Sequence, residues 1–361
     1  MAERILDIEN LKVDIPLASG MLHAVNGISL HVSRGETLCI VGESGCGKSL
    51  TSLAIMDLLP KKAIRNATRL ELLGESLVGL RESQMADIRG NRMGMIFQEP
   101  MTSLNPAYTI GSQMAETLRR HRQVTMEEAL KTSSIMLEKV GITAAESRLS
   151  QYPHQLSGGL RQRVMIAMTL LCEPDLLIAD EPTTALDVTI QAQILLLLAE
   201  LQREFDMGLI LITHDLGIVA RIADRVAVMY AGQIVEQGTV KEIFETPRHP
   251  YTRGLMDCIP VPGKIERGKP LGSIPGIVPS LIGSFDGCRF ADRCSHAKTA
   301  CRQGEIELKS TASGHGSRCI IELPSATSTS ITKKKQASKS ASGKSTKKKT
   351  TPQKTAKRRT R

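Results

Sequence analysis

The spacing of apolar and polar residues changes along the chain, and the change separates predicted strands from predicted helices. Ile28–Val32 alternates apolar and polar positions, which is typical of a strand with one buried face. Thr37–Val41 is a short, nearly continuous apolar run, as expected of a strand buried on both faces. Residues 1–40 are therefore predicted to be β-structure that ends with a buried strand.

After the β region, a part of the chain with apolar residues at helical spacing is followed by short apolar runs of the length of a strand. Apolar residues recur at helical spacing in Glu116–Arg122, Met126–Val140 and Leu160–Cys172. Short apolar runs follow at Leu176–Ala179, Leu209–Ile212 and Val226–Tyr230. Strands that alternate with helices predict an α/β domain with a largely parallel sheet.

The composition changes near Pro247, which predicts a boundary. Residues 247–287 are rich in Pro and Gly, and four of the eight cysteines lie between Cys288 and Cys319. From about Ser325 the chain is mostly Lys, Ser, Thr and Ala, too polar to bury a core, so we expect disorder there. The predicted parts are 1–246, with a helical subdomain at about 99–172, a C-terminal extension at 247–324, and a basic tail at 325–361.

The formal charge of +10 belongs to that tail. From Ile331 onward there are 13 Lys or Arg and no acid, so the rest of the chain is mildly acidic. Such a tail fits a solvated segment, an anionic lipid surface or nonspecific nucleic acid. Aromatic residues make up only 2% of the chain, which argues against a stacking platform for single strands. We expect no specific nucleic-acid partner.

The sequence predicts neither export nor a membrane span. The first seven residues carry acids and no apolar run, so we expect no signal peptide. The longest apolar stretches, Val164–Cys172 and Ile194–Ala199, are far shorter than the roughly 20 residues that a span needs. An intracellular protein is expected, with its cysteines as thiols or metal ligands rather than disulfides.

A phosphate-binding loop follows the buried strand at Thr37–Val41. Residues 42–49 fit the pattern G-x-x-x-x-G-K-S, and a helix is predicted from there to about Leu59, ended by Pro60. Backbone N–H groups of such a loop surround a phosphate, and the helix N-terminus favours its charge. Lys48 should reach the β- and γ-phosphates, and the Ser49 hydroxyl should bind Mg²⁺. The predicted nucleotide-binding residues of this loop are Gly42, Glu43, Ser44, Gly45, Cys46, Gly47, Lys48 and Ser49.

Two carboxylates end the strand at Leu176–Ala179. Asp180 is placed to hold Mg²⁺, and Glu181 to polarise an attacking water. About twenty residues earlier, Leu156–Gln162 opens a helix, and its serine hydroxyl and free N–H groups form a second candidate anion site.

With these elements, the chain resembles the nucleotide-binding subunit of an ATP-binding cassette (ABC) transporter. The elements that match are the signature motif Leu156–Gln162, the Q-loop Gln98, the D-loop Ala185–Asp187 and the switch His214, in family order across residues 1–245. The resemblance implies a P-loop NTPase (RecA-like) core with an N-terminal antiparallel β region and an inserted helical subdomain. It also implies a small Cys-containing C-terminal extension.

The resemblance further implies how ATP is bound and hydrolysed. The signature motif of a partner subunit would complete the site across a dimer interface, through Ser157, Gly158, Gly159 and Gln162, and the D-loop Asp187 is a further nucleotide-binding candidate. Gln98 would contact Mg²⁺ and sense the γ-phosphate, and His214 would orient the attacking water together with Glu181. The family's adenine-stacking aromatic is missing around Ser19–His23, so adenine contacts are expected from His23 or Val25.

Finer resemblances indicate the "D"-type subunit of bacterial oligopeptide, dipeptide or nickel importers. They lie in Met95–Pro106, Leu156–Met168 and His249–Thr252. This implies an ATPase that energises import of di- or oligopeptides, with a nickel or other small-solute importer as the alternative. The implied partners are an "F"-type ATPase subunit or a second copy, two transmembrane permease subunits, and a periplasmic or extracellular substrate-binding protein. The implied location is peripheral, on the cytoplasmic face of the inner membrane.

The cysteines at 288, 294, 301 and 319 form a further candidate site. A loop-rich segment with few apolar residues often needs a covalent or metal staple, and this spacing lacks the C-x2-C pairs of common zinc sites. Some members of the importer group carry a [4Fe–4S] cluster on four such cysteines, which makes Cys288, Cys294, Cys301 and Cys319 candidate ligands. Zinc and plain reduced thiols stay open. The other cysteines are Cys39, Cys46, Cys172 and Cys258, expected to be small apolar fillers.

Two other classes of ABC ATPase fit less well. An ATPase acting on DNA ends needs a long coiled coil between the phosphate loop and the signature motif, but Lys48 and Leu156 are only 108 positions apart. A ribosome-acting member usually carries two cassettes, and the sequence has one.

Overall fold

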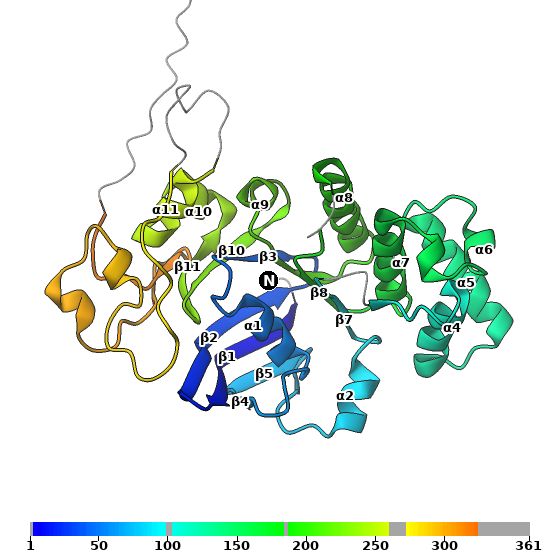
Figure 1. Cartoon of the computed structure of the whole chain (residues 1–361), viewed down its shortest axis with the longest axis horizontal. Coiled ribbons are helices and arrows are strands. Elements are labelled where there is room, and N and C mark those ends of the chain that lie inside the picture. Colours follow the sequence, from blue (N-terminus) through cyan, green and yellow to red (C-terminus); the bar gives the residue numbers. More distant parts are fainter. Residues whose placement is uncertain (1–2, 99–102, 184–186, 260–271, 324–361) are drawn as a thin grey trace, which may run out of the picture. The chain divides into compact units, whose positions relative to one another are not determined.

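The computed structural model describes residues 3–98, 103–183, 187–259 and 272–323, and it contains two β-sheets (Figure 1). The smaller sheet is antiparallel, and its longest pair is a hairpin of two 14-residue strands. Its strands are β1 (Arg4–Leu17), β2 (Gly20–Ser33), β4 (Ile64–Asn66), β5 (Arg69–Leu72) and β6 (Glu75–Ser76). The expected N-terminal β region is confirmed.

The larger sheet has a parallel centre. Its strand order is β12-β13-β11-β10-β3-β9-β8-β7, and the pairs from β10 to β7 are parallel. The strands are β3 (Thr37–Val41), β7 (Met93–Ile96), β8 (Leu176–Asp180), β9 (Gly208–Ile212), β10 (Arg225–Tyr230), β11 (Gln233–Thr239), β12 (Lys309–Ser310) and β13 (Gly316–Ser317). This arrangement confirms the predicted α/β fold.

Register in the parallel centre brings the carboxyl ends of four strands to one edge. Ile40 pairs with Ile212, and Asp180 pairs with that same residue from the other side. Ile96, at the end of β7, pairs with Ala179 of β8. Because ligands of parallel sheets bind beyond the carboxyl ends of the strands, the segments that follow these residues share one candidate site.

The helices form between and after these strands. They are α1 (Lys48–Ile55), α2 (Glu82–Ile88), α4 (Ile110–His121), α5 (Met126–Lys139), α6 (Ala145–Arg148), α7 (Gly158–Leu170), α8 (Val188–Glu204), α9 (Leu216–Ile222), α10 (Val240–Glu245) and α11 (Pro250–Asp257). Helices α4, α5 and α7 pack against one another (Figure 1). Thr125 begins α5 with a capping box, in which its side chain and that of Glu128 each accept a backbone N–H.

Some predicted boundaries are wrong. Helix α1 ends at Ile55 rather than near Leu59, because Asp57 takes a left-handed backbone conformation with φ of 54°. Helix α4 begins at Ile110, six residues before the predicted start, because the Thr109 side chain accepts a hydrogen bond from Ser112 N–H.

The C-terminal extension contacts both sheets. Strand β13 pairs with β11, and Leu22 of β2 forms an isolated bridge with Ile282. The described residues include three short 3-10 helices, η1 (Pro153–Gln155), η2 (Ala291–Arg293) and η3 (Thr299–Arg302), of which the last two lie in the extension. The extension packs its Phe290 ring against Tyr230 and Tyr251, with ring centroids 5.2 and 5.3 Å apart.

Three predicted features fall wholly or partly outside the described residues. They are the basic tail at 325–361, residues 99–102 of the Q-loop segment, and Ala185 and Leu186 of the D-loop. Among the residues that are described, no helix is both long and apolar enough to cross a membrane.

Candidate functional site

The phosphate loop joins β3 to α1, and two of its glycines are required by close backbone contacts. A Cβ on Gly42 would lie 2.1 Å from the Met229 carbonyl oxygen, and one on Gly47 would lie 2.5 Å from the Ala24 carbonyl oxygen. Both glycines have positive φ, of 154° and 101°. The loop therefore needs glycine for space as well as for conformation.

Lys48 lies along the inside of this loop. Its side-chain amine donates to the carbonyl oxygens of Gly42, at 2.9 Å, and Glu43, at 3.0 Å. The residue is only 5% exposed, so the loop holds a buried cation at the N-terminus of α1. A buried ammonium group surrounded by backbone dipoles suits a phosphate ligand.

Ser44, Gly45 and Cys46 form the turn between these residues. Gly45 has positive φ, a Cβ added there would meet only open space, and Cys46 is fully buried. The Cys46 sulfur lies 4.0 Å from the Lys48 amine, and burial raises the pKa of its thiol. Cys46 is therefore a neutral filler under the loop, as expected.

Ser49 and Asp180 meet at the edge of the sheet. The Ser49 hydroxyl donates to the Asp180 carboxylate at 3.1 Å. Burial raises the pKa of Asp180, and the hydrogen bond from Ser49 opposes that shift. A hydroxyl beside a buried carboxylate is an oxygen pair of the kind that Mg²⁺ prefers.

Glu181 lies between two polar side chains that come from distant parts of the sequence. The Gln98 amide donates to its carboxylate at 3.2 Å, and Nδ1 of His214 lies 3.6 Å from the same oxygen. The Glu181 side chain is 17% exposed, whereas that of His214 is 71% exposed. Glu181 has φ of 44°, a left-handed conformation that is uncommon for a residue other than glycine.

The signature residues form the start of α7. Ser157 is the N-cap, and its exposed side chain makes no capping hydrogen bond, while Gly158 and Gly159 form the first turn. Gln162 is buried and donates to the Pro182 carbonyl at 2.6 Å, which links α7 to the segment after Glu181. Asp187 is the exposed N-cap of α8. Within the described residues, no hydrogen bond or ion pair joins this group to the phosphate loop.

His23 lies on β2 beside the phosphate loop. Its Nδ1 is 2.6 Å from a carboxylate oxygen of Asp14, so a carboxylate fixes the orientation of the ring. The next residue, Ala24, provides the carbonyl that approaches Gly47. Val25 is fully buried and so less available than His23 to a base.

Two contacts between the extension and the phosphate loop could not be predicted from the sequence. The Tyr251 hydroxyl accepts a hydrogen bond from the Glu43 N–H at 2.9 Å. Arg293 donates to both carboxylate oxygens of Glu43, at 2.6 and 3.0 Å. These pairs are separated by more than 200 positions, and neither Tyr251 nor Arg293 carries a local signal that would have revealed them.

The four extension cysteines line a single apolar cavity. Cys288, Cys294, Cys301 and Cys319 border it together with His249 and Phe290. The four are free thiols, and burial raises the pKa of three of them: Cys288, to about 11, Cys294 and Cys319. The cavity volume is about 10 Å³, and the described residues contain no group arranged to hold a metal ion. In this conformation the thiols converge but are packed too tightly to enclose a cluster.

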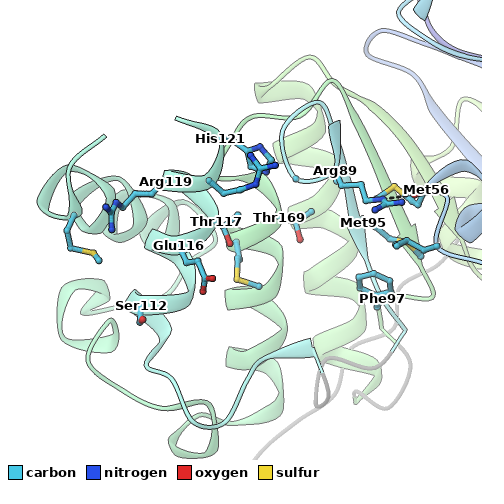
Figure 2. A pocket seen from close by; sticks show the side chains of 16 residues that line it. Met56, Arg89, Met95, Phe97, Ser112, Glu116, Thr117, Arg119, His121 and Thr169 are labelled. Carbon is cyan, nitrogen blue, oxygen red and sulfur yellow. Dashed lines mark hydrogen bonds between the residues drawn. The ribbon is translucent and has the colours of Figure 1, made fainter. Parts of the chain in front are cut away.

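A separate groove of about 830 Å³ is lined by Phe97, the residue before Gln98. Figure 2 shows Phe97, Met95 and Met56 at one end and the α4 residues Arg119 and His121 at the other. Phe97 is 40% exposed. The groove therefore has apolar residues together with Arg89 at one end, and the α4 side carries Arg119 and His121 together with Glu116.

Two family models match the chain. The model described as "ABC transporter" covers residues 25–184, and the model described as "Oligopeptide/dipeptide transporter, C-terminal region" covers residues 235–301. The first match includes the phosphate loop and Glu181. The second includes Tyr251 and Arg293.

Similar proteins and structures agree with the models. A protein of Brucella abortus named as a peptide import ATP-binding protein is 53% identical over 88% of this chain and 96% of its own length. The dipeptide transport ATP-binding protein DppD of Bacillus subtilis is 51% identical over 83% of this chain and 89% of its own length. A dimeric, post-hydrolysis ATP-binding cassette solved with ADP and phosphate is 25% identical, with a TM-score of 0.58 over 65% of this chain and 99% of that one. The expected cassette fold is confirmed, and the chain belongs to the ABC transporter family as an ATP-binding subunit of the oligopeptide/dipeptide importer group.

Proposed function

We propose that this subunit hydrolyses ATP at the edge of the larger sheet, with Glu181 as the residue that activates water. The observation that carries the proposal is the position of Glu181, which follows Asp180 directly and contacts both Gln98 and His214. Lys48 would bind the β- and γ-phosphates, and Ser49, Asp180 and Gln98 would hold Mg²⁺. When bound, Mg²⁺ neutralises charge that develops on the phosphate oxygens.

Glu181→Gln tests this role because it keeps the shape of the side chain and removes the base. We expect kcat to fall by about 10²–10⁴-fold while ATP still binds. Glu200→Gln, on the exposed side of α8, is the matched control. Turnover of the Glu181 variant within a few-fold of the control would contradict the assignment.

A second ATPase subunit would complete the site. The exposed Ser157, Gly158 and Asp187 fit this role, because they are not engaged by the phosphate loop of their own chain. The similar solved cassette is described as a dimer with ADP and phosphate. We propose a heterodimer with a related "F"-type subunit, and light scattering of the ATP-bound Glu181→Gln variant, alone and with that subunit, tests it. If no dimer forms, either by the variant alone or with the "F"-type subunit, this part of the proposal is contradicted.

The cargo that we propose is di- and oligopeptides. Relatives at 51–53% identity are named for peptide or dipeptide transport, and the C-terminal model is that of oligopeptide/dipeptide transporters. A nickel importer is the alternative that the sequence resemblance leaves open. Measuring the uptake of labelled dipeptides and of labelled nickel separates the two candidate cargoes.

The groove of Figure 2 is the site that we propose for a permease subunit. A short amphipathic helix would place apolar side chains against Met95 and Phe97 and an acid near Arg119. Phe97, which lines the groove, directly precedes Gln98, so a permease bound there would be linked to the site of hydrolysis. Such docking would hold the subunit peripherally, on the cytoplasmic face of the inner membrane.

Phe97→Asp tests the docking site, with Val78→Asp as a control that also changes an exposed apolar residue. We expect the Phe97 variant to lose co-purification with the permease subunits and the Val78 variant to keep it. Equal retention by both variants would contradict the docking site.

We further propose that the extension cysteines bind a [4Fe–4S] cluster. Four thiols on one cavity provide the right donor set, although the loops that carry them would have to move apart by the size of a cluster. Zinc or reduced thiols are the alternatives. Iron and sulfide content and visible absorbance of anaerobically purified protein distinguish all three.

We propose the same division of the chain as the sequence suggests. Residues 1–246 would form the nucleotide-binding domain, with its helical subdomain at about 99–172, and residues 247–324 the extension. The tail at 325–361 would be dispensable for ATP hydrolysis. A chain that ends after residue 324 tests the last point by its ATPase rate.

A further inference from the structure

The C-terminal extension forms hydrogen bonds with both the backbone and the side chain of Glu43, the second residue of the phosphate loop. The Glu43 N–H donates to the Tyr251 hydroxyl at 2.9 Å. The Glu43 carboxylate receives hydrogen bonds from both terminal nitrogens of Arg293, at 2.6 and 3.0 Å. A bidentate guanidinium–carboxylate pair fixes both the position and the orientation of the carboxylate. The extension therefore holds backbone and side chain of Glu43 at once.

Arg293 is itself held firmly. Its side chain is 6% exposed, and it also donates to the carbonyl oxygens of Pro275, at 2.9 Å, and Ile274, at 3.1 Å. The guanidinium lies over the rings of Tyr230 and Phe290, 5.7 and 5.9 Å from their centroids. A long side chain that is fixed along its length loses little further freedom when it binds Glu43.

Further contacts link the extension to the surroundings of the same loop. Arg289 donates to the Ala231 carbonyl, and the next residue, Gly232, donates its N–H to the Cys46 carbonyl at 2.9 Å. The Leu281 carbonyl accepts the His23 N–H at 2.9 Å. The extension thus supports the phosphate loop at Glu43, the turn under Cys46, and the neighbouring strand β2.

The charge of Glu43 makes this support relevant to nucleotide binding. The second residue of this loop, which would bind the polyphosphate of a nucleotide, is the carboxylate Glu43, and Lys48 contacts its backbone carbonyl. An unpaired carboxylate there would repel phosphate groups and compete for Lys48. Arg293 neutralises it from the side of the extension, leaving Lys48 for the ligand.

We propose that Arg293 is a positioning residue for nucleotide binding: by pairing with Glu43 it neutralises and orders the phosphate loop, so that the cysteine segment sets the affinity for nucleoside triphosphate. The proposal rests on the ATP site described under the proposed function. Cys294 follows Arg293 directly, and the Cys288 N–H donates to the Cys301 carbonyl at 2.7 Å, so the thiols and Arg293 share one small folded unit. A change in the packing of Cys294 would therefore act on Glu43 through Arg293.

The test compares Arg293→Gln, Arg293→Lys, Glu43→Gln and the double variant Arg293→Gln/Glu43→Gln. The matched control is Arg302→Gln, because Arg302 belongs to the same unit but forms an exposed pair with Asp292 at 2.8 Å. The readouts are the Kd of a fluorescent ATP analogue, the KM and kcat of ATP hydrolysis, and thermal unfolding to show that each variant is folded.

We expect Arg293→Gln to weaken binding of the analogue by about tenfold or more, raising KM with kcat within about twofold of wild type. Arg293→Lys should lose less, because it keeps the charge. Removing the Glu43 carboxylate should rescue most of the loss, so that the double variant binds within about threefold of Glu43→Gln alone. Arg302→Gln should bind like wild type. Cys294→Ser should weaken binding in the same direction as Arg293→Gln, and the two changes together should add little.

Several results would overturn the proposal. If the folded Arg293→Gln variant binds the ATP analogue like wild type, Arg293 has no role in nucleotide binding. If the affinity of the double variant falls by the sum of the losses of the two single variants, the Arg293–Glu43 pair is not the cause of the weaker binding. If Arg293→Gln does not fold, Arg293→Lys with unchanged affinity decides against the proposal. Wild-type protein that binds no ATP overturns the proposed ATP site itself, whereas ATP-binding wild type with unaltered Arg293 variants overturns this inference alone.

Discussion

Replacing each of two glycines of the phosphate loop by alanine separates backbone conformation from steric contact. Gly45 and Gly47 both have positive φ, of 77° and 101°. A Cβ on Gly45 would meet nothing within 4 Å, whereas a Cβ on Gly47 would lie 2.5 Å from the Ala24 carbonyl oxygen and 2.7 Å from the Met229 methyl group. The two variants differ chiefly in this contact.

The contacts set the size of the expected effects. Alanine at a left-handed position costs about 1–2 kcal/mol, which is the full expectation for Gly45→Ala. Gly47→Ala adds a clash with backbone, and such overpacking costs about 1–3 kcal/mol more. The Met229 side chain can move, but the Ala24 carbonyl belongs to β2 and cannot move by itself. Gly47→Ala should therefore be less stable than Gly45→Ala by about 2 kcal/mol.

Urea unfolding of both variants, followed by circular dichroism, measures the difference, and binding of a fluorescent ATP analogue reports on the loop. We expect the lower midpoint and the weaker binding for Gly47→Ala. Equal midpoints for the two variants would refute the reasoning, because the close approach of β2 to the loop would then have no energetic weight.

Other predictions concern the metal site, the extension and pH. Asp180→Asn should raise the Mg²⁺ concentration needed for half-maximal hydrolysis by about tenfold or more, as measured by a Mg²⁺ titration. His315→Ala should destabilise the protein by about 2–3 kcal/mol in urea unfolding, because the fully buried Glu236 loses its 2.7 Å partner. Burial lowers the pKa of His249 to about 3, so its neutral form stabilises the fold above pH 6.5, and stability is lost at up to about 1.4 kcal/mol per pH unit as the pH falls below that. His249→Asn should flatten this dependence between pH 6.5 and 4; an unchanged slope would contradict the assignment.

The residues that can be predicted from sequence belong to patterns with a local cause. Gly42 and Lys48 lie in a strand–loop–helix pattern, and the apolar run before Asp180 predicts a buried strand that ends at a sheet edge. The parallel order of β3, β8 and β9 then brings these segments together. Local periodicity and strand-end chemistry are enough to predict such a site.

Other features depend on contacts that leave no local pattern. Strands β4 to β6 are two to four residues long and β7 is four, too short for a periodicity to be recognised, so the apolar pattern predicts no strand over residues 60–96. Arg293 is one arginine among many in the sequence, and only the fold brings it to Glu43. Cys288 and Cys319 also line one cavity. Their spacing in the sequence indicates a candidate site, but only the packing of the fold brings the two side chains to the same cavity.

The assay that bears most directly on this account is uptake of labelled di- and oligopeptides, alongside labelled nickel, by cells whose only copy of the chain is Glu181→Gln. Strains with the wild-type chain and with Glu200→Gln are the controls. The account predicts that peptide uptake is lost only in the Glu181 strain and that nickel uptake is unchanged in all three. Peptide uptake equal to the controls would contradict it, and loss of nickel uptake alone would assign the subunit to a metal importer.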